Sequence, residues 1–157
     1  MKRICLLVAL LGLAWQVGVA QSPAVDSTSF SKLAEQAREL TPKATAAGGN
    51  ASIKLEEYPN HFTMIALRMK SGGGEVHENN ADFFIVVQGK ATLISGGKLE
   101  DPQPAGKGEM RGKSVIGGTR QELKTGDVAH IPAGVPHQLI LADGDTFSYY
   151  VIKVKEK

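Results

Sequence analysis

The 157-residue chain carries 18 lysine and arginine residues against 16 aspartate and glutamate residues, a formal net charge of +2 at pH 7. A balance this even excludes the strongly basic surface that nucleic acids or anionic membranes attract. The single cysteine, Cys5, excludes an intramolecular disulfide, so the fold must be stable through its core alone. A chain of this length is expected to form one domain.

Residues 1–20 have the pattern of a secretory signal peptide. Two basic residues precede an apolar run, 4–15, that is shorter than the roughly 20 residues a membrane-spanning helix needs. Small residues at 18–20 suit signal peptidase, and we expect cleavage after Ala20. The mature protein is then periplasmic or secreted and has no membrane association. The alternative is an uncleaved N-terminal anchor.

The next region, residues 21–50, is expected to contain one short helix and a connector. Apolar residues recur at spacings of three and four between Ser27 and Leu40, which predicts one buried helical face. Pro42 is expected to end this helix. The following residues, up to Asn50, are rich in alanine and glycine, so we interpret them as a connector that lays the helix against the domain.

From residue 51 to residue 157 the pattern changes to alternation with period two. Short runs rich in β-branched and aromatic residues, separated by Gly, Pro and Asn turns, predict an all-β sandwich or barrel. The polar segment 96–126 is expected to be a long loop or an extended hairpin on one rim. The predicted strands are residues 51–58, 62–69, 82–87, 91–95, 127–131, 138–141 and 146–154.

The most informative segment is 126–137, a glycine, five residues, and then Pro-x-Gly-x-x-His. Pro132 presets one turn dihedral and Gly134 permits a positive φ, so the chain can reverse and place His137 at the start of a second strand. This segment resembles the second conserved motif of the cupin superfamily. It departs from that motif only at Leu141, where the family commonly has asparagine.

The first cupin motif is resembled by a segment that begins at Gly74 and closes at Gly89. The family pattern has two alternating histidines, a glutamate four or five positions on, and a glycine after six more residues. Glu75 stands at the first histidine position, His77 at the second, and Asp82 at the glutamate position. The spacing is therefore kept while two of the three residue types differ.

The resemblance covers roughly two-thirds of the chain. It implies an all-β fold in which residues 51–157 form a single cupin β-barrel, also called a double-stranded β-helix or jelly roll, preceded by one short α-helix. Cupins include isomerases, oxygenases, decarboxylases, lyases, ligand sensors and storage proteins. The fold therefore does not choose among these functions.

Four side chains in the two motifs predict a metal site. Residues two apart on a strand point to the same face, so Glu75 and His77 should project into the barrel, where Asp82 and His137 converge on them. Two imidazoles and two carboxylates suit a divalent ion such as Fe, Mn, Ni or Zn. Aspartate is about 1.5 Å shorter than glutamate, so Asp82 should fall short or require a strand shift. The alternative is a polar pocket without metal, in which the carboxylates hydrogen-bond the histidines.

Strand alternation also predicts the pocket wall and the surroundings of Glu75. A carboxylate beside apolar Phe84 and Val86 should have its pKa raised by desolvation, which would suit Glu75 as a catalytic general base. His130 is expected to have a packing or rim role. The residues expected to line the pocket are Phe84, Val86, Gln88, Leu139 and Leu141.

We therefore expect an exported protein that binds a divalent metal in the barrel mouth and acts on or binds a small molecule. A metal-dependent oxygenase, isomerase or lyase would fit this site. The alternative is a non-catalytic small-molecule-binding cupin without metal. Pairing into a homodimer through edge strands is a further hypothesis, with Tyr149, Tyr150 and Ile152 on the last strand as the contact surface.

Overall fold

The computed structural model describes residues 25–156, so the predicted signal peptide lies outside the described residues. No helix in this part of the chain is long and apolar enough to cross a membrane. In chain order the elements are α1 (Phe30–Glu39), α2 (Thr41–Ala46), β1 (Asn50–Glu57), β2 (His61–Arg68), β3 (Gly74–His77), β4 (Asn80–Ser95), β5 (Lys98–Leu99), β6 (Gln103–Gly106), β7 (Glu109–Gly112), β8 (Val115–Ile116), β9 (Thr119–Lys124), β10 (Val128–Ile131), β11 (His137–Ile140) and β12 (Phe147–Lys155).

The N-terminal region forms two short helices rather than one helix and a connector. Ser29 caps α1, because its side chain accepts a hydrogen bond from the backbone N–H of Lys32 at 3.2 Å. Pro42 lies in the first turn of α2, where a backbone N–H would have no acceptor within the helix. The proline that was expected to stop the first helix therefore also begins the second.

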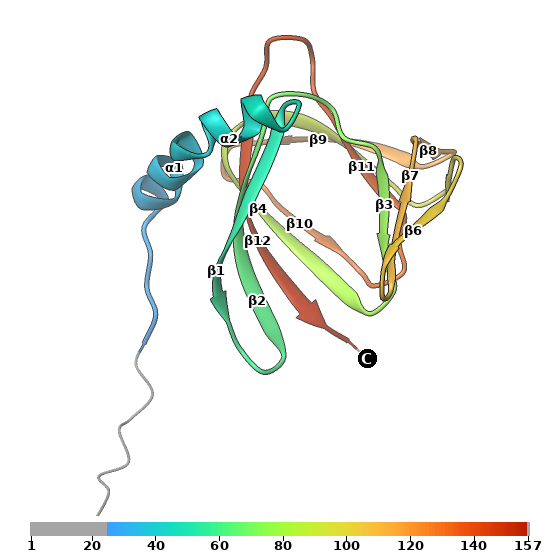
Figure 1. Ribbon diagram of the computed structural model, residues 1–157, viewed down its shortest axis with the longest axis horizontal. Helices are drawn as coiled ribbons and strands as arrows, with labels where there is room; N and C mark the ends of the chain where they lie inside the picture. The colour runs from blue at the N-terminus through green and yellow to red at the C-terminus, as the bar shows by residue number, and fades with distance from the viewer. Residues whose placement is uncertain (1–24, 157) are drawn as a thin grey trace, which may run out of the picture.

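Ten strands form one strongly curled sheet, in the order β1-β2-β12-β4-β11-β3-β7-β6, with β9 and β10 also paired to β4. The short strands β5 and β8 form a separate two-stranded sheet. Figure 1 shows β1 and β2 on one side of the barrel and β3, β6 and β7 on the other. The predicted strands 82–87 and 91–95 are one continuous strand, β4. It passes Gly89, whose φ is +89°, and any Cβ there would overlap the carbonyl oxygen of Thr146. Only glycine fits this position.

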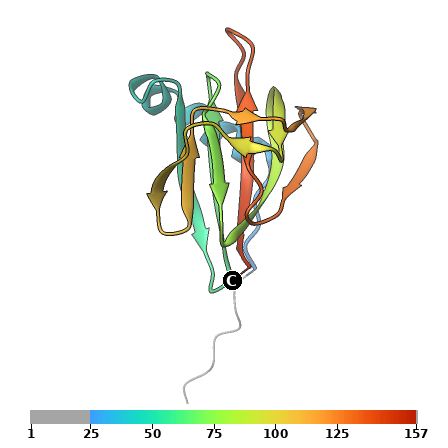
Figure 2. The ribbon, with the colours of Figure 1, turned by 90° about the vertical axis from the view of Figure 1, so that its right-hand side faces the viewer.

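The segment 96–126 is neither a plain loop nor a single hairpin. It contains β5 to β9, and β9 runs antiparallel to the second half of β4. The β6–β7 hairpin continues the sheet beyond β3, because β7 pairs with β3 along its whole length. Figure 2 shows the side of the barrel on which β3, β6 and β7 lie. The segment thus builds one wall of the barrel next to the first cupin motif.

Two hydrophobic clusters hold the structure together. The larger one fills the barrel and includes Phe147, which is 0 % exposed, and Leu123. The second lies outside the barrel, where Leu33 and Ala37 of α1 pack against Ile65 of β2 and its neighbours. This outer cluster docks both helices on the sheet and so fixes the position of α2 relative to the barrel.

The last strand does not offer the dimer surface expected from the sequence. β12 lies between β2 and β4 in the sheet and has no free edge. Tyr149 is only 4 % exposed and faces the barrel interior, because inward and outward side chains alternate along the strand. A homodimer therefore cannot form through the edge of β12, and Tyr150 and Ile152 lie on the outer, partly exposed face of this strand.

We predict that Leu33→Ala lowers the free energy of unfolding by about 2–5 kcal/mol, because it leaves a cavity between α1 and the sheet. Phe30→Ala is the matched control in the same helix, since Phe30 is 54 % exposed, and it should change stability by no more than about 0.5 kcal/mol. Urea denaturation measures both. Equal, small effects would contradict the docking of α1 on the barrel.

Candidate metal centre

Three strands deliver the four residues of the two motifs to one place inside the barrel. Glu75 and His77 lie two apart on β3 and share its inner face, Asp82 lies on β4, and His137 opens β11 directly opposite Glu75. The turn before β11 contains Gly134, with φ +80°, whose N–H donates to the carbonyl oxygen of His77 at 2.8 Å. The turn of the second motif thus anchors the strand that carries the first.

The four side chains converge as predicted from the spacing. The Nε2 atom of His77 lies 3.2 Å from Oδ2 of Asp82 and 3.9 Å from Oε2 of Glu75. The Nε2 atom of His137 lies 3.5 Å from Oε1 of Glu75 and 3.7 Å from Oδ2 of Asp82. One atom each of Glu75, His77 and His137 lies within 4.8 Å of the others, a group that could hold a metal ion.

The hydrogen bonds on the far side of each ring decide which nitrogen carries a proton. His137 Nδ1 lies 3.0 Å from the carbonyl oxygen of Val135, and His77 Nδ1 lies 2.5 Å from a carboxylate oxygen of Glu109. A carbonyl or a carboxylate can only accept, so both Nδ1 atoms are donors. Each neutral ring then turns the lone pair of its Nε2 atom toward carboxylate oxygens.

Lone pairs that face carboxylates repel them unless a cation lies between. His137 is 1 % exposed, and its Nε2 atom has no hydrogen-bond partner among the described residues. Asp82, at 3 % exposure, is equally shielded from water. The group therefore requires either a proton on each Nε2 atom or a metal ion among them, and its donor atoms fit a divalent ion of borderline softness.

Each carboxylate of the group also has a basic partner from a neighbouring strand. Arg111 of β7 lies directly opposite Glu75 and forms an ion pair with it, and Nη2 of Arg68 lies 3.7 Å from the same carboxylate. Lys153 lies directly opposite Asp82, with Nζ 2.8 Å from Oδ1. These are cross-strand pairs, so the register of the sheet sets the charge balance of the site.

These partners reverse the expected behaviour of Glu75. Burial raises the pKa of its carboxyl, but the nearby His137 ring and the guanidinium groups of Arg111 and Arg68 hold that pKa well below its usual range. The expectation of a raised pKa is therefore wrong, because cations that the sequence pattern did not place there surround the group. Glu75 is a poor proton acceptor at neutral pH and a good metal ligand.

The pKa values of Asp82 and His77 shift in opposite directions. Burial raises the pKa of Asp82, but its hydrogen bond to His77 and the charge of Lys153 lower that pKa below its ordinary value. Burial lowers the pKa of His77, but the same bond to Asp82 raises it above its ordinary value. Each shift favours the charged form of its side chain relative to the ordinary value.

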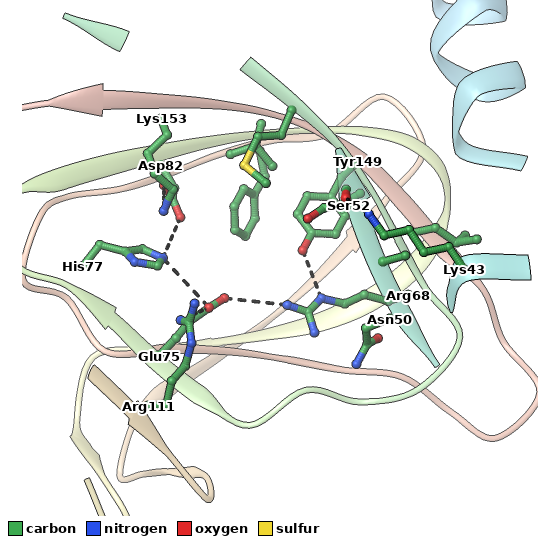
Figure 3. A pocket seen from close by; sticks show the side chains of 16 residues that line it. Lys43, Asn50, Ser52, Arg68, Glu75, His77, Asp82, Arg111, Tyr149 and Lys153 are labelled. Atoms are coloured by element: carbon green, nitrogen blue, oxygen red, sulfur yellow. Dashed lines mark hydrogen bonds and ion pairs between the residues drawn. The ribbon is translucent and has the colours of Figure 1, made fainter. Parts of the chain in front are cut away.

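A cavity of about 420 Å³ extends from this group toward the helices. Figure 3 shows His77 and Asp82 at one end, Arg68 and Tyr149 between, and Lys43 of α2 at the other end. It is lined by Lys43, Asn50, Ala51, Ser52, Met64, Ala66, Leu67, Arg68, Glu75, His77, Asp82, Phe84, Arg111, Tyr149, Val151 and Lys153.

Of the five residues expected to line the pocket, the structure places only Phe84 in the wall of this cavity. Val86, Leu139 and Leu141 lie deeper, in the apolar cluster that fills the barrel. Gln88 faces the outside of the barrel, beside α1. A β-bulge causes the outward orientation of Gln88, because Tyr149 pairs with Val86 and Ser148 with Gln88, so one extra residue on β4 reverses the alternation.

His130 also lies outside the site, as expected, and stacks on Phe83 with 4.3 Å between ring centroids. Five residues that hold the four motif residues in place were not predicted from the sequence. Strand alternation was the available signal for three of them, because Arg68 follows the inward-facing residues of β2 and Tyr149 and Lys153 share the inner face of β12. The residues missed are Arg68, Glu109, Arg111, Tyr149 and Lys153.

Comparison with known proteins supports the fold. A family model described as an AraC-like ligand binding domain matches residues 111–157. No curated protein matches the chain. The chain is similar to a conserved Klebsiella pneumoniae protein with a double-stranded β-helix domain, with a TM-score of 0.52 and 16% identity, over 70% of this chain and 80% of that one.

Two further solved structures have similar folds. The cupin domain of Schizosaccharomyces pombe Cnp3 has a TM-score of 0.51 and 13% identity, over 68% of this chain and 61% of that one. A protein from Thermus thermophilus has a TM-score of 0.50 and 14% identity, over 69% of this chain and 85% of that one. At such identities the likeness concerns the fold alone. The chain has the double-stranded β-helix fold of the cupins, as its two motifs predicted.

Proposed function

We propose that this protein binds a divalent transition metal ion through Glu75, His77 and His137, and that it binds and acts on a small molecule beside that ion. The observation that carries the proposal is the orientation of the two Nε2 lone pairs toward carboxylate oxygens in a buried site. Two histidines and one carboxylate leave positions open on a metal such as Fe, Mn, Zn or Ni. When bound, such an ion polarises an oxygen atom of the substrate.

The surrounding residues have defined supporting roles under this proposal. Glu109 holds Nδ1 of His77 and so keeps its Nε2 atom free for the ion, the usual arrangement of a metal-bound histidine. Arg111 and Arg68 orient Glu75 as a charged ligand. Asp82 has one oxygen bound to Lys153 and the other directed at the histidines. It therefore acts as a hydrogen-bond acceptor beside the ion or as a fourth ligand.

With redox-active iron this site would suit an oxygenase, and with zinc or manganese it would suit an isomerase or a lyase. We assign Glu75 to the metal rather than to general base catalysis, because the lowered pKa of its carboxyl makes it a weak base. Glu75→Gln should therefore weaken metal binding. The assignment to general base would require the metal to stay bound while turnover is lost.

We predict that the protein, purified without chelator and without a nickel column, contains close to one equivalent of a transition metal. His77→Ala and His137→Ala should each lose it, because each removes one of three ligands. His130→Ala is the matched control, since His130 lies on the neighbouring strand β10 but stacks on Phe83 outside the site. Elemental analysis of the four proteins measures this. A native protein that contains no metal and takes up none on titration would contradict the proposal.

A second candidate function is a small-molecule-binding protein without metal. One observation favours it: Lys153 and Arg111 already neutralise Asp82 and Glu75, so these two carboxylates need no metal ion to balance their charge. Under this alternative, ligand binding would be saturable and would survive chelation. The chelated protein therefore separates the two candidates.

Lys153→Gln gives a sharper distinction. In the chelated protein it should lower the free energy of unfolding by about 3–5 kcal/mol, because it leaves the buried carboxylate of Asp82 without its cation. If the metal site exists, adding zinc or manganese at 100 times its dissociation constant should raise the free energy of unfolding of this variant by about 2.7 kcal/mol. In a binding protein that has no metal site, the added ion should leave the free energy of unfolding unchanged.

Lys155→Gln is the control for this variant, because Lys155 lies two residues further along β12 and is exposed. It should change stability by no more than about 0.5 kcal/mol. Urea denaturation of the wild type and both variants, with chelator and with metal, gives all the values. A Lys153→Gln protein as stable as the control would show that the pair with Asp82 contributes nothing.

We also propose that the protein is exported through a cleaved signal peptide and functions in the periplasm or outside the cell. The basic start, the short apolar run and the small residues before Gln21 support this. Mass spectrometry of the protein from the extracytoplasmic fraction should give a chain that begins at Gln21. A chain that retains residues 1–20 would contradict cleavage.

A further inference from the structure

We infer that the cavity binds a small organic anion, with its carboxylate or phosphate group held by Arg68 and Lys43 and its body directed toward the two histidines. This inference rests on the proposed function for the orientation of the ligand toward the metal group. The recognition of the anion rests on the cations alone. It specifies the substrate class that the fold leaves open.

The charges in the cavity wall favour an anion. Four cations line it, Lys43, Arg68, Arg111 and Lys153, against two carboxylates, those of Glu75 and Asp82. Glu109, behind His77, reduces this excess of two positive charges to one. A divalent ion at the histidines adds two more. A cavity with a net positive charge and apolar walls attracts small anions and raises their local concentration.

The guanidinium of Arg68 has hydrogen-bond donors to spare. Its Nε atom donates to the hydroxyl oxygen of Tyr149 at 2.9 Å, and this is its only hydrogen bond to any described residue. Its Nη2 atom lies 3.7 Å from Glu75, beyond hydrogen-bond distance. The bond to buried Tyr149 fixes the plane of the guanidinium. The remaining N–H groups form the planar fork that matches a carboxylate or a phosphate.

Lys43 provides the second cation, at the open end of the cavity. Its ammonium donates to the carbonyl oxygen of Ser52 at 3.1 Å, which uses one of its three donors. Figure 3 shows Lys43 and Ser52 near Arg68 and at the opposite end of the cavity from His77. Because Lys43 lies on α2, the docking of the helices on the sheet contributes directly to this end of the cavity.

Apolar side chains line the space between the two ends. A volume of about 420 Å³ falls within the range of small-molecule sites. A ligand with a charged group at one end and a short hydrocarbon or ring body satisfies both the cations and these walls. The apolar residues that line the cavity are Ala51, Met64, Ala66, Leu67, Phe84 and Val151.

Isothermal titration calorimetry with three probes tests the inference. Glutarate carries carboxylates, glycerol 3-phosphate carries a phosphate, and glutaramide is the neutral match of glutarate. At least one anion should bind about tenfold more tightly than glutaramide, because hydrogen bonds to charged groups contribute that much. The anion that binds more tightly identifies the group that the cavity recognises.

Two variants and a control locate the binding. Lys43→Gln and Arg68→Gln should each weaken anion binding about tenfold, and Lys43→Gln should leave metal content unchanged. Lys98→Gln is the control, because Lys98 is exposed on β5 and does not line the cavity. It should bind the anions as the wild type does. An anion held only by the metal would be insensitive to Lys43→Gln, and that result would overturn the inference.

Titrations of the chelated protein separate this inference from the proposed function. Anion binding that persists without metal and is lost in Lys43→Gln supports the inference even if no metal binds to the native protein. Equal affinity for glutarate, glycerol 3-phosphate and glutaramide overturns the inference, whether or not metal binds. Lys43→Gln changes an exposed residue, so the test does not depend on whether Arg68→Gln folds.

Discussion

Two buried imidazole rings whose Nε2 atoms face two carboxylates are the constraint on which this structure depends. Such a group is costly inside a protein unless every charge has a partner. The barrel meets this requirement through strand pairing: Arg111 lies opposite Glu75, and Lys153 lies opposite Asp82. The backbone carbonyl of Val135 and the carboxylate of Glu109 hold the outer nitrogens of the rings. A cation between the Nε2 atoms would remove the remaining repulsion, and a metal ion would do so without protonating either ring.

The same pairing makes the site sensitive to register. A shift of one residue on a strand turns every side chain to the other face, so a slip of β7 against β3 would separate Arg111 from Glu75 and Glu109 from His77 at once. Gly134 and Gly89 fix other parts of the same sheet, because Gly134 donates a hydrogen bond to the carbonyl oxygen of His77 and Gly89 allows β4 to approach the start of β12 closely. The conformational constraints of the two motifs therefore serve the charge balance of the site as well as the turns themselves.

The sequence predicted the parts of the site that local chemistry decides. Motif spacing and strand alternation were enough to bring Glu75, His77, Asp82 and His137 together, because each motif contains its own turn. The cations could not be placed in this way, since Arg111 lies in a segment without clear alternation and its pairing with β3 is a long-range event. The pKa of Glu75 was wrongly expected to be raised for the same reason, because the cations around its carboxylate could not be placed from the sequence. The misplacement of Gln88 has a different cause, a bulge beside Gly89 that strand alternation alone does not indicate.

The departures from the family pattern become intelligible as linked changes. A carboxylate in place of the first histidine adds a negative charge to the group, and the guanidinium groups of Arg111 and Arg68 offset it. The shorter Asp82 has one carboxylate oxygen beside Lys153 and the other directed at the histidines, so it contacts both a cation of the barrel wall and the histidine pair. The centre is thus a more charged version of the cupin pattern, and Lys43 at the far end of the cavity brings the total to four cations against the three carboxylates of Glu75, Asp82 and Glu109. That excess is what a small anion would neutralise.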